Sequence, residues 1–345
     1  MKAMGPVVVL HPEGLLREPN WRVLSLKEVG RTRGHIWEQG ALYHATKNGP
    51  LISLGNAGPV RHKKQLLVLH DANIWDIPDA FSLSYRLLHK AMRPILATKA
   101  EALVTVSQFS ADALAKHLDV PSCRFSIIPN GSDHILRAGR DDRVLKNNKL
   151  SSRGYLLCVG NLSPNKNLDR LIKAHALAGA NVLPLAVVGG ITSGVTAEEL
   201  RANPTVRMLG RVTDDALRSL YENAAGFIFP SLYEGFGIPP LEAMQLGTPV
   251  LASNSTAMPE VLGRAALYFD PRNIEDMSAQ LQRFSQASMN ERKSMIAQGH
   301  QVSANFTWEK SADLLVEQIL ALQATGFSDA LDVRTIGEGP LRKVS

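Results

Sequence analysis

Two carboxylates, Glu234 and Glu242, stand eight residues apart on either side of a glycine-rich turn and are well placed for ligand chemistry. The apolar run at 226–229 predicts a buried strand that ends shortly before them. Pro239 and Pro240 then predict a helix start, because proline is favoured at the first helical position. We therefore expect Glu234 at the carboxyl end of a strand and Glu242 in the first turn of a helix. Strand ends of this kind bind ligands in open α/β sheets, and a helix N-terminus favours anions.

Each glutamate alone also allows a plainer interpretation. Glu242 could simply favour the helix dipole, and Glu234 could be a solvated loop residue. The whole string E-G-F-G-I-P-P-L-E-A-M, followed by G-T-P-V and M-P-E-V-L-G, favours a binding site. It resembles the nucleotide-sugar site of retaining glycosyltransferases of family 4, which have the GT-B fold. The resemblance covers most of residues 35–320 and is most specific over 226–263.

The resemblance implies roles for the two glutamates and for residues around them. Glu234 would hold hydroxyls of the donor sugar, and Glu242 would accept hydrogen bonds from ribose hydroxyls, since a carboxylate offers only acceptors. The implied catalytic residues are His70, Lys166 and Glu234, and the implied donor-binding residues are Asn161, Arg211, Val212, Gly235, Phe236, Gly237, Ile238 and Glu242.

Lys166 follows a predicted strand and precedes a predicted helix in the stretch VGNLSPNKNLDRLIKA. A cation at that strand end could neutralise a diphosphate leaving group, and such charge-assisted contacts are strong. A solvated surface lysine is the alternative. The stretch resembles the family's G-x-L-x-P-x-K-N loop, in which an arginine often follows the glycine or precedes the lysine. Asn161 and Asn165 stand at those positions here.

His70 ends the apolar run QLLVLH in the first half of the chain. The resemblance implies that its ring and main-chain oxygen lie near the transferred sugar. Asp71 could either orient His70 or contact the acceptor. Ser107 matches a loop that lines the cleft in the family, and we expect it on the acceptor side. A hydrogen-bonded structural histidine is the alternative for His70. The pair Asn130-Gly131 matches a loop of the family but is first of all a turn signal.

Short apolar runs alternate with helical segments along the whole chain, which predicts doubly wound parallel sheets. We expect an α/β fold with two Rossmann-like domains facing a cleft. Relative to the family, we expect a first β-α unit to be missing before Val7, so that the chain either is a truncated or mis-started version or builds its first domain differently. The predicted divisions are an acceptor-side domain at 1–148, a nucleotide-sugar domain at 149–305, a helix crossing back at 306–325 and a tail at 326–345.

Composition indicates a globular protein of the cytoplasm, with 45% hydrophobic and 20% charged residues and neither a signal peptide nor a spanning run. Cys123 and Cys158 are predicted to be reduced, and Cys158 to be buried. The chain contains no D-x-D, no G-x-x-x-x-G-K-[ST] and no G-x-G-x-x-G. We therefore expect no metal, no cofactor beyond the sugar nucleotide substrate, and no nucleic-acid partner.

Charge is uneven along the chain. Residues 1–150 hold 21 Lys and Arg against 13 Asp and Glu, a net +8, and the remainder is close to neutral. Arg86, Lys90 and Arg93 stand at i, i+4 and i+7 and share one helical face. That face could dock on the anionic inner face of the membrane, where each basic residue contributes about 1 kcal/mol. An ordinary solvated helix face is the alternative.

The predicted function is that of a retaining, metal-independent hexosyltransferase using a nucleotide-diphosphate sugar. The stretches HIWEQ, SLGNAGP and LHDANIWDIPDAFS resemble bacterial mannosyl- and rhamnosyltransferases of surface-polysaccharide assembly. That resemblance favours GDP-mannose as donor and a glycan or polyprenyl-linked acceptor. The alternative is a catalytically weak or inactive member that binds the sugar nucleotide as a scaffold. An epimerase on the same fold is disfavoured by the E-G-F-G-I-P string.

Overall fold

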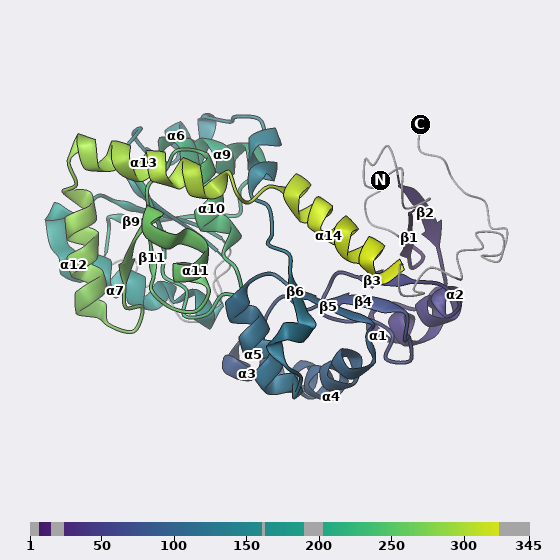
Figure 1. Ribbon diagram of the computed structural model, residues 1–345. Helices are drawn as coiled ribbons and strands as arrows, with labels where there is room; N and C mark the ends of the chain where they lie inside the picture. The colour runs from purple at the N-terminus through teal and green to yellow at the C-terminus, as the bar shows by residue number, and fades with distance from the viewer. Residues whose placement is uncertain (1–6, 15–23, 161–162, 190–202, 324–345) are drawn as a thin grey trace.

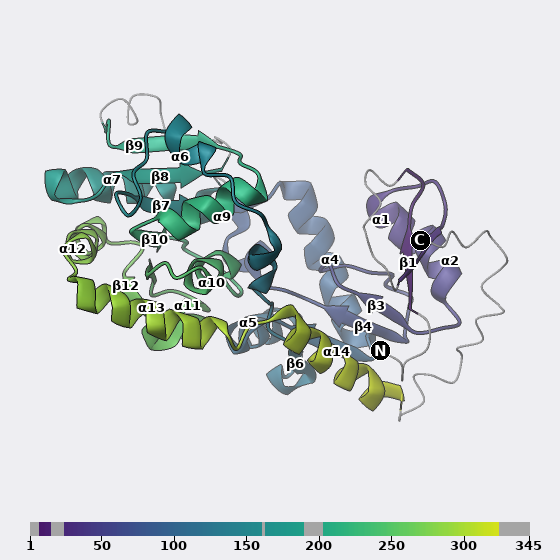
Figure 2. The same cartoon turned by 90° about the horizontal axis from the view of Figure 1, so that it is seen from above.

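The computed structural model describes residues 7–14, 24–160, 163–189 and 203–323. These residues form two α/β units that lie side by side (Figures 1 and 2). The chain passes from the first unit to the second after residue 127 and returns at residue 308. The predicted α/β class with parallel sheets is confirmed.

The second unit is built on a six-stranded parallel sheet in the order β12-β11-β10-β7-β8-β9. Chain order reverses between β7 and β10, so the helices that follow these two strands pack on opposite faces. Alternate side chains enter two cores, with Leu157 and Phe227 on one face and Leu156 and Ile228 on the other. The strands are β7 Leu156–Val159, β8 Leu185–Val188, β9 Val206–Gly210, β10 Gly226–Phe229, β11 Val250–Ser253 and β12 Ala266–Phe269.

Side-chain caps mark where the helices of this unit begin. Thr213 caps α9, Asn273 caps α12, and Ser288 caps α13 in a capping box with Glu291. The helices are α6 Arg143–Asn147, α7 Leu168–Ala178, α9 Asp214–Asn223, α10 Ile238–Gln245, α11 Met258–Leu262, α12 Ile274–Ser285 and α13 Met289–Ser303. The 3-10 turns are η4 Asp133–Arg137, η5 Pro164–Lys166, η6 Gly179–Asn181 and η7 Gly263–Ala265.

The first unit has a four-stranded parallel sheet in the order β3-β4-β5-β6, and β1 and β2 pair separately in parallel. Strand β2 was not predicted, because its sequence SLKE lacks an apolar run. The strands are β1 Val8–His11, β2 Ser25–Glu28, β3 Leu51–Ser53, β4 Gln65–Val68, β5 Ala102–Thr105 and β6 Phe125–Ile127. The helical segments are α1 Gly34–Trp37, η1 Glu38–Leu42, α2 Tyr43–Thr46, α3 Asn73–Asp76, η2 Pro78–Ala80, α4 Leu83–Lys99, α5 Gln108–Leu118 and η3 Ser122–Arg124.

The last helix, α14 (Trp308–Leu322), leaves the second unit and lies along the first, as Figure 1 shows in yellow. Ile319 packs into a core with residues of β4 and β5. Ser126 donates a 2.6 Å hydrogen bond to Gln318, and Ser311 donates a 2.5 Å bond to the Pro129 carbonyl. Helix α14 therefore completes one face of the four-stranded sheet.

The connection between the units packs with the second one. Ile135 and Val144 belong to its core, although both precede the division predicted at residue 148. That division and those at 305 and 325 remain predictions, and the tail at 326–345 lies outside the described residues.

Candidate active site

Lys166 and Glu234 meet where chain order reverses in the six-stranded sheet. Lys166 lies in the loop after β7, and Glu234 lies in the loop after the neighbouring strand β10. Lys166 Nζ lies 2.5 Å from Glu234 Oε1, and the two side chains are 22% and 17% exposed. The pair is thus half-buried at the edge where open α/β sheets bind ligands.

Asn167 joins the loop that carries Lys166 to the loop that carries Glu234 through hydrogen bonds. It is fully buried with φ of 57°, and its side-chain amide donates to the carbonyls of Pro230 at 3.1 Å and Pro271 at 2.7 Å. The main-chain N–H of Leu232 donates to the carbonyl of Asn165 at 2.7 Å. These bonds hold the two loops in one register, so the two charges face each other without a substrate.

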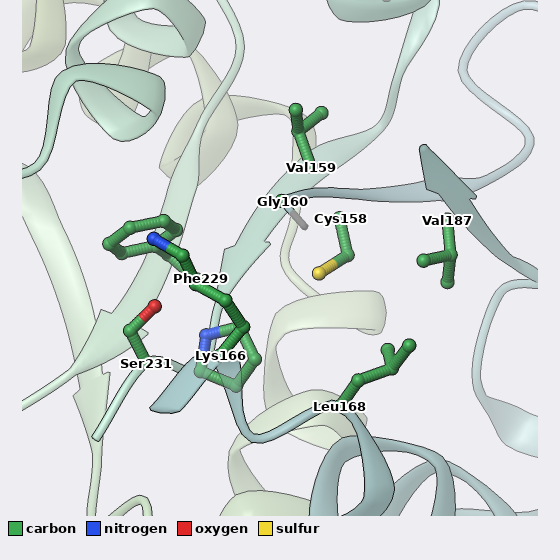
Figure 3. Close-up of a pocket in the computed structure, with 9 residues that line it drawn as sticks. Cys158, Val159, Gly160, Lys166, Leu168, Val187, Phe229 and Ser231 are labelled. Atoms are coloured by element: carbon green, nitrogen blue, oxygen red, sulfur yellow. The ribbon is translucent and has the colours of Figure 1, made fainter. Parts of the chain in front are cut away.

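The amine of Lys166 also lies over the ring of Phe229, 5.5 Å from its centroid (Figure 3). Lys166 and Phe229 line a cavity of about 10 Å³ together with Cys158, Gly160 and Ser231, with room for about one water molecule. Cys158 is buried as predicted, and burial raises the pKa of its thiol to about 12. The Cys158 thiol is therefore uncharged at physiological pH where it lines the cavity.

The turn from Gly235 to Ile238 brings the second unit against the first. A side chain at Gly235 would meet the His70 carbonyl oxygen at 2.6 Å, so only glycine fits. Gly237 has φ of 96°, where glycine is favoured, and a side chain there would strike Met258. Phe236 is buried, and Ile238 begins α10. The two glycines thus let the turn lie close to both of its neighbours.

Glu242 lies deeper in the helix than expected. Helix α10 begins at Ile238 with prolines at its start, so Glu242 falls beyond the first turn. It is 8% exposed, accepting a 2.9 Å hydrogen bond from the Tyr221 hydroxyl and pairing with His134 Nε2 at 2.8 Å. The prediction of a first-turn position was wrong, because the helix starts two residues before Pro240. The alternative that Glu242 is a helix-start glutamate favouring the dipole does not hold, because Glu242 lies beyond the first turn of α10.

His70 lies at the contact between the units. Its ring Nε2 lies 2.8 Å from the Leu54 carbonyl, and its main-chain N–H donates to Asn56 at 2.7 Å. Its carbonyl faces Gly235, beside the turn that follows β10. The ring has a structural partner, so its part in catalysis remains a prediction.

Ser107 and α5 also join the two units. The hydroxyls of Ser107 and Ser110 donate to the Gly235 carbonyl at 2.6 and 3.1 Å. The Glu260 carboxylate accepts the main-chain N–H groups of Gln108 and Phe109 at 2.7 and 2.8 Å, which satisfies two free donors at the start of α5. Ser107 is thus buried in the contact, and its predicted acceptor role is untested.

Asp71 and Arg93 are close neighbours in the first unit. Arg93 Nη1 donates to the Asp71 carbonyl at 3.2 Å, and its guanidinium lies over the Trp75 ring. Burial raises the pKa of the Asp71 carboxyl. Arg93 is only 1% exposed, so the prediction that it faces a membrane with Arg86 and Lys90 was wrong. The Arg93 side chain turns inward toward Asp71.

The remaining predicted donor residues lie after β9 and β7. Arg211 directly follows β9 and is exposed, and Val212 packs against the core of the second unit. Asn161 lies outside the described residues.

Within the ranges that the structure describes, no group of three His, Cys, Asp or Glu side chains could hold a metal ion. No described helix is long and apolar enough to cross a membrane.

Comparison with known families assigns both units. Residues 7–135 match the family described as Glycosyltransferase Family 4, and residues 140–302 match Glycosyl transferases group 1. This chain belongs to glycosyltransferase family 4. O-antigen chain mannosyltransferase B of Escherichia coli is 32% identical over 263 residues, which cover 73% of this chain and 68% of the relative. O-antigen chain mannosyltransferase RfbU of Salmonella typhimurium is 29% identical over 76% of this chain and 77% of its own length.

Solved structures give this glycosyltransferase the GT-B fold. HepE of Anabaena, solved in complex with UDP, superposes with a TM-score of 0.68 at 16% identity, over 88% of this chain and 86% of HepE. Sucrose-phosphate synthase of Thermosynechococcus elongatus superposes with a TM-score of 0.64 at 20% identity, over 82% and 76% of the two chains. The predicted fold and enzyme class are confirmed by these matches and by the two family assignments.

Three residues that contact the site of this family 4 enzyme were not among the predicted site residues. His134 and Tyr221 bond Glu242, and Glu260 joins the units through α5. Glu260 does stand within the M-P-E-V-L-G string that carries the resemblance. Nothing in the spacing of His134 or Tyr221 points to Glu242, since they are brought to it from a linker and a different helix.

Proposed function

We propose that this enzyme transfers mannose from GDP-mannose, with retention, to a glycan or polyprenyl-linked acceptor of bacterial polysaccharide assembly. The observation that carries the proposal is the Lys166–Glu234 pair at the strand-order reversal, with Glu242 on the helix that follows. The sugar is suggested by relatives whose names describe them as mannosyltransferases of O-antigen chains. GDP is proposed as the usual carrier of that sugar, and its binding is open to direct test.

Lys166 would act on the leaving group. Its ammonium has three donors, and within the described residues one of them bonds Glu234, so the other two could reach phosphate oxygens. When the bond from sugar C1 to the phosphate oxygen breaks, negative charge grows on the diphosphate. A preplaced cation stabilises that charge without reorganising at the moment of reaction.

Glu234 would hold the sugar while the new bond forms. One of its oxygens faces Lys166, and the other can accept hydrogen bonds from sugar hydroxyls. In retaining transfer the acceptor oxygen attacks C1 from the face that the diphosphate leaves, and a departing phosphate oxygen takes the acceptor's proton. The product sugar then keeps the configuration of the donor, which one-dimensional NMR of the product detects.

Ligand-induced stabilisation tests the donor. The melting temperature would be measured with GDP, UDP, ADP and dTDP, because a ligand at 100 times its Kd adds about 2.7 kcal/mol. We expect the largest shift with GDP, and release of GDP from GDP-mannose at a rate that acceptor raises. Stabilisation by GDP with neither transfer nor hydrolysis would favour the scaffold alternative. A larger shift with UDP would replace the proposed donor.

The same enzyme would dock on an anionic membrane through the outer face of α4. Leu83, Leu87, Leu88 and Ile95 are exposed there, at 60%, 61%, 45% and 44%. Arg86 and Lys90 lie at the border of this face and are half-buried. Apolar side chains that insert, bordered by basic groups, suit the boundary of anionic lipid head groups and acyl chains.

Co-sedimentation with vesicles tests the docking. We expect binding to vesicles rich in anionic lipid at low salt, less binding at high salt, and little to neutral vesicles. Leu87→Asp should abolish it, whereas Leu177→Asp, which alters a similarly exposed leucine of α7, should not. Equal binding of both variants and the wild type would show that the outer face of α4 does not dock on the membrane.

A further inference from the structure

A chain of hydrogen bonds leads from α14 to the carboxylate of Glu242. The indole N–H of Trp308 lies 3.1 Å from His134 Nδ1, and His134 Nε2 lies 2.8 Å from Glu242 Oε1. An indole N–H can only donate, so Nδ1 must present its lone pair. The hydrogen of the neutral imidazole is then on Nε2 and points at Glu242. The second oxygen of Glu242 accepts from Tyr221 at 2.9 Å.

His134 and Trp308 lie on the two chain crossings between the units. His134 belongs to η4, on the outward crossing, and Trp308 is the first residue of α14, on the return. Asp133 accepts the Trp308 main-chain N–H at 2.7 Å, and a side chain at Gly131 would meet that nitrogen at 2.3 Å. Gly131 is therefore required by close approach, and the two crossings are joined directly beside α10.

We propose that His134 is a positioning residue for the donor nucleotide, holding Glu242 in the rotamer that receives ribose hydroxyls while Trp308 selects the tautomer of His134. This inference rests on the proposed function, in which Glu242 binds the ribose. A carboxylate has about four lone-pair sites, and His134 and Tyr221 occupy two, one on each oxygen. The remaining sites suit the two vicinal hydroxyls of a ribose.

The acidic groups around the His134 ring favour its protonated form, whereas the bond from the Trp308 N–H requires its neutral form. The hydrogen bond to Glu242 raises the pKa of His134, and the charges of Glu242, Asp133 and Asp214 act in the same direction. An imidazolium has no lone pair for the Trp308 N–H, so protonation of the ring would break that bond. Raising the pH favours the neutral ring, so binding is best compared at several pH values up to the most alkaline at which the protein stays folded.

A comparison of ribose and dideoxyribose nucleotides tests the inference. Calorimetry would measure binding of GDP and 2′,3′-dideoxy-GDP to the wild type and to variants of the full chain. We expect the wild type to prefer GDP at least tenfold, and His134→Ala to lose most of that preference by weakening GDP alone. His134→Gln should recover part of it, because its amide nitrogen reaches the place of Nε2. His134→Asn, which is one methylene shorter, should not.

The outcomes separate the inference from the function on which it rests. If His134→Ala weakens both nucleotides equally, His134 only supports the fold, and the inference is overturned. The same holds if the Gln and Asn variants behave alike. Trp308→Phe should reduce the preference for GDP over 2′,3′-dideoxy-GDP less than His134→Ala does. An unchanged preference in Trp308→Phe would show that Trp308 does not select the tautomer of His134. If the wild type binds GDP but ignores the ribose hydroxyls, the role of Glu242 in the proposed function fails as well.

Discussion

The motif glutamates of the second unit and His89 of the first unit are buried or half-buried titratable groups that differ in their hydrogen bonding. At the strand ends of the second unit each glutamate of the motif is paired, Glu234 with Lys166 and Glu242 with His134 and Tyr221. In the first unit His89 is 2% exposed, and neither of its ring nitrogens has a hydrogen-bond partner in the described part of the chain. Paired charges preorganise a site for ligand chemistry, whereas an unpaired buried base makes stability depend on pH. Changes to the paired groups of the second unit should therefore alter catalysis and binding, and changes at His89 should alter stability.

The largest effect is expected from Lys166→Ala. Loss of a preplaced charge that acts on the leaving group should lower kcat by about 100- to 1,000-fold, as for other electrostatic stabilisers. Lys293→Ala, which changes an exposed lysine of α13, is the control and should leave kcat unchanged. The measurement is the initial rate at saturating donor. A kcat within a factor of two of the wild type would show that the cation does not act on the leaving group.

A smaller effect is expected from Glu242→Gln. The amide keeps the size of the side chain but loses the charge, and a hydrogen bond to a charged group contributes about 1.5–3 kcal/mol. Calorimetry should therefore show GDP binding weakened by roughly 10- to 150-fold, since 1.4 kcal/mol corresponds to a factor of ten. Glu275→Gln, an exposed helical position of α12, should bind as the wild type does. Equal affinity of all three proteins would contradict the assignment.

His89 should make the first unit sensitive to acid. Burial lowers the pKa of its ring to about 4, and the charges of Arg93 and His35 add to this effect. The unfolded chain therefore binds more protons between pH 6.5 and 4, so stability falls as pH falls through that window. The loss from this group should be on the order of 2–3 kcal/mol.

Urea unfolding of the wild type and His89→Leu at pH 7 and pH 4 measures this effect. The variant should lose less stability on acidification than the wild type does. His44→Leu, which changes an exposed histidine, should lose as much as the wild type. A pH dependence that is the same in all three would assign the acid sensitivity to other groups.

The smallest effect is expected from removal of divalent metal. If Lys166 supplies the positive charge at the leaving group, EDTA should leave the transfer rate unchanged within error. The control is a metal-dependent D-x-D glycosyltransferase assayed in the same buffer. Its activity should be lost in EDTA. Loss of activity in EDTA that Mg²⁺ or Mn²⁺ restores would mean that the second unit uses a metal in place of, or together with, its lysine.

Most of the regular structure could be predicted from local pattern. The continuous apolar runs at 51–53, 102–106 and 226–229 predict strands, because such runs are typical of buried parallel strands. Strands β3, β5 and β10 lie there with boundaries within one residue. The segments at 168–178 and 214–223 are likewise predicted to be helical, and α7 and α9 have these boundaries. Strand β2, with its polar sequence SLKE, could not be found in this way. Its pairing with β1 depends on a partner in space and not on its own composition.

The sequence by itself determined which groups stand at the strand ends of the second unit. Lys166 and Glu234 follow strands whose apolar runs are continuous, so chain order and the rules of parallel sheets place them at one edge. The glycines around Phe236 could likewise be recognised as a close turn from the residues alone. These features are local, and local interactions are encoded by neighbouring residues.

Only the tertiary structure decided which side chains meet across the chain. Helical spacing places Arg93 on one face with Arg86 and Lys90, but spacing cannot say that this part of the face turns inward onto Asp71. His134 reaches Glu242 from a position 108 residues earlier in the chain, through a linker whose path depends on how the two units pack. Contacts of this kind have no periodicity, because they are set by the packing of whole elements.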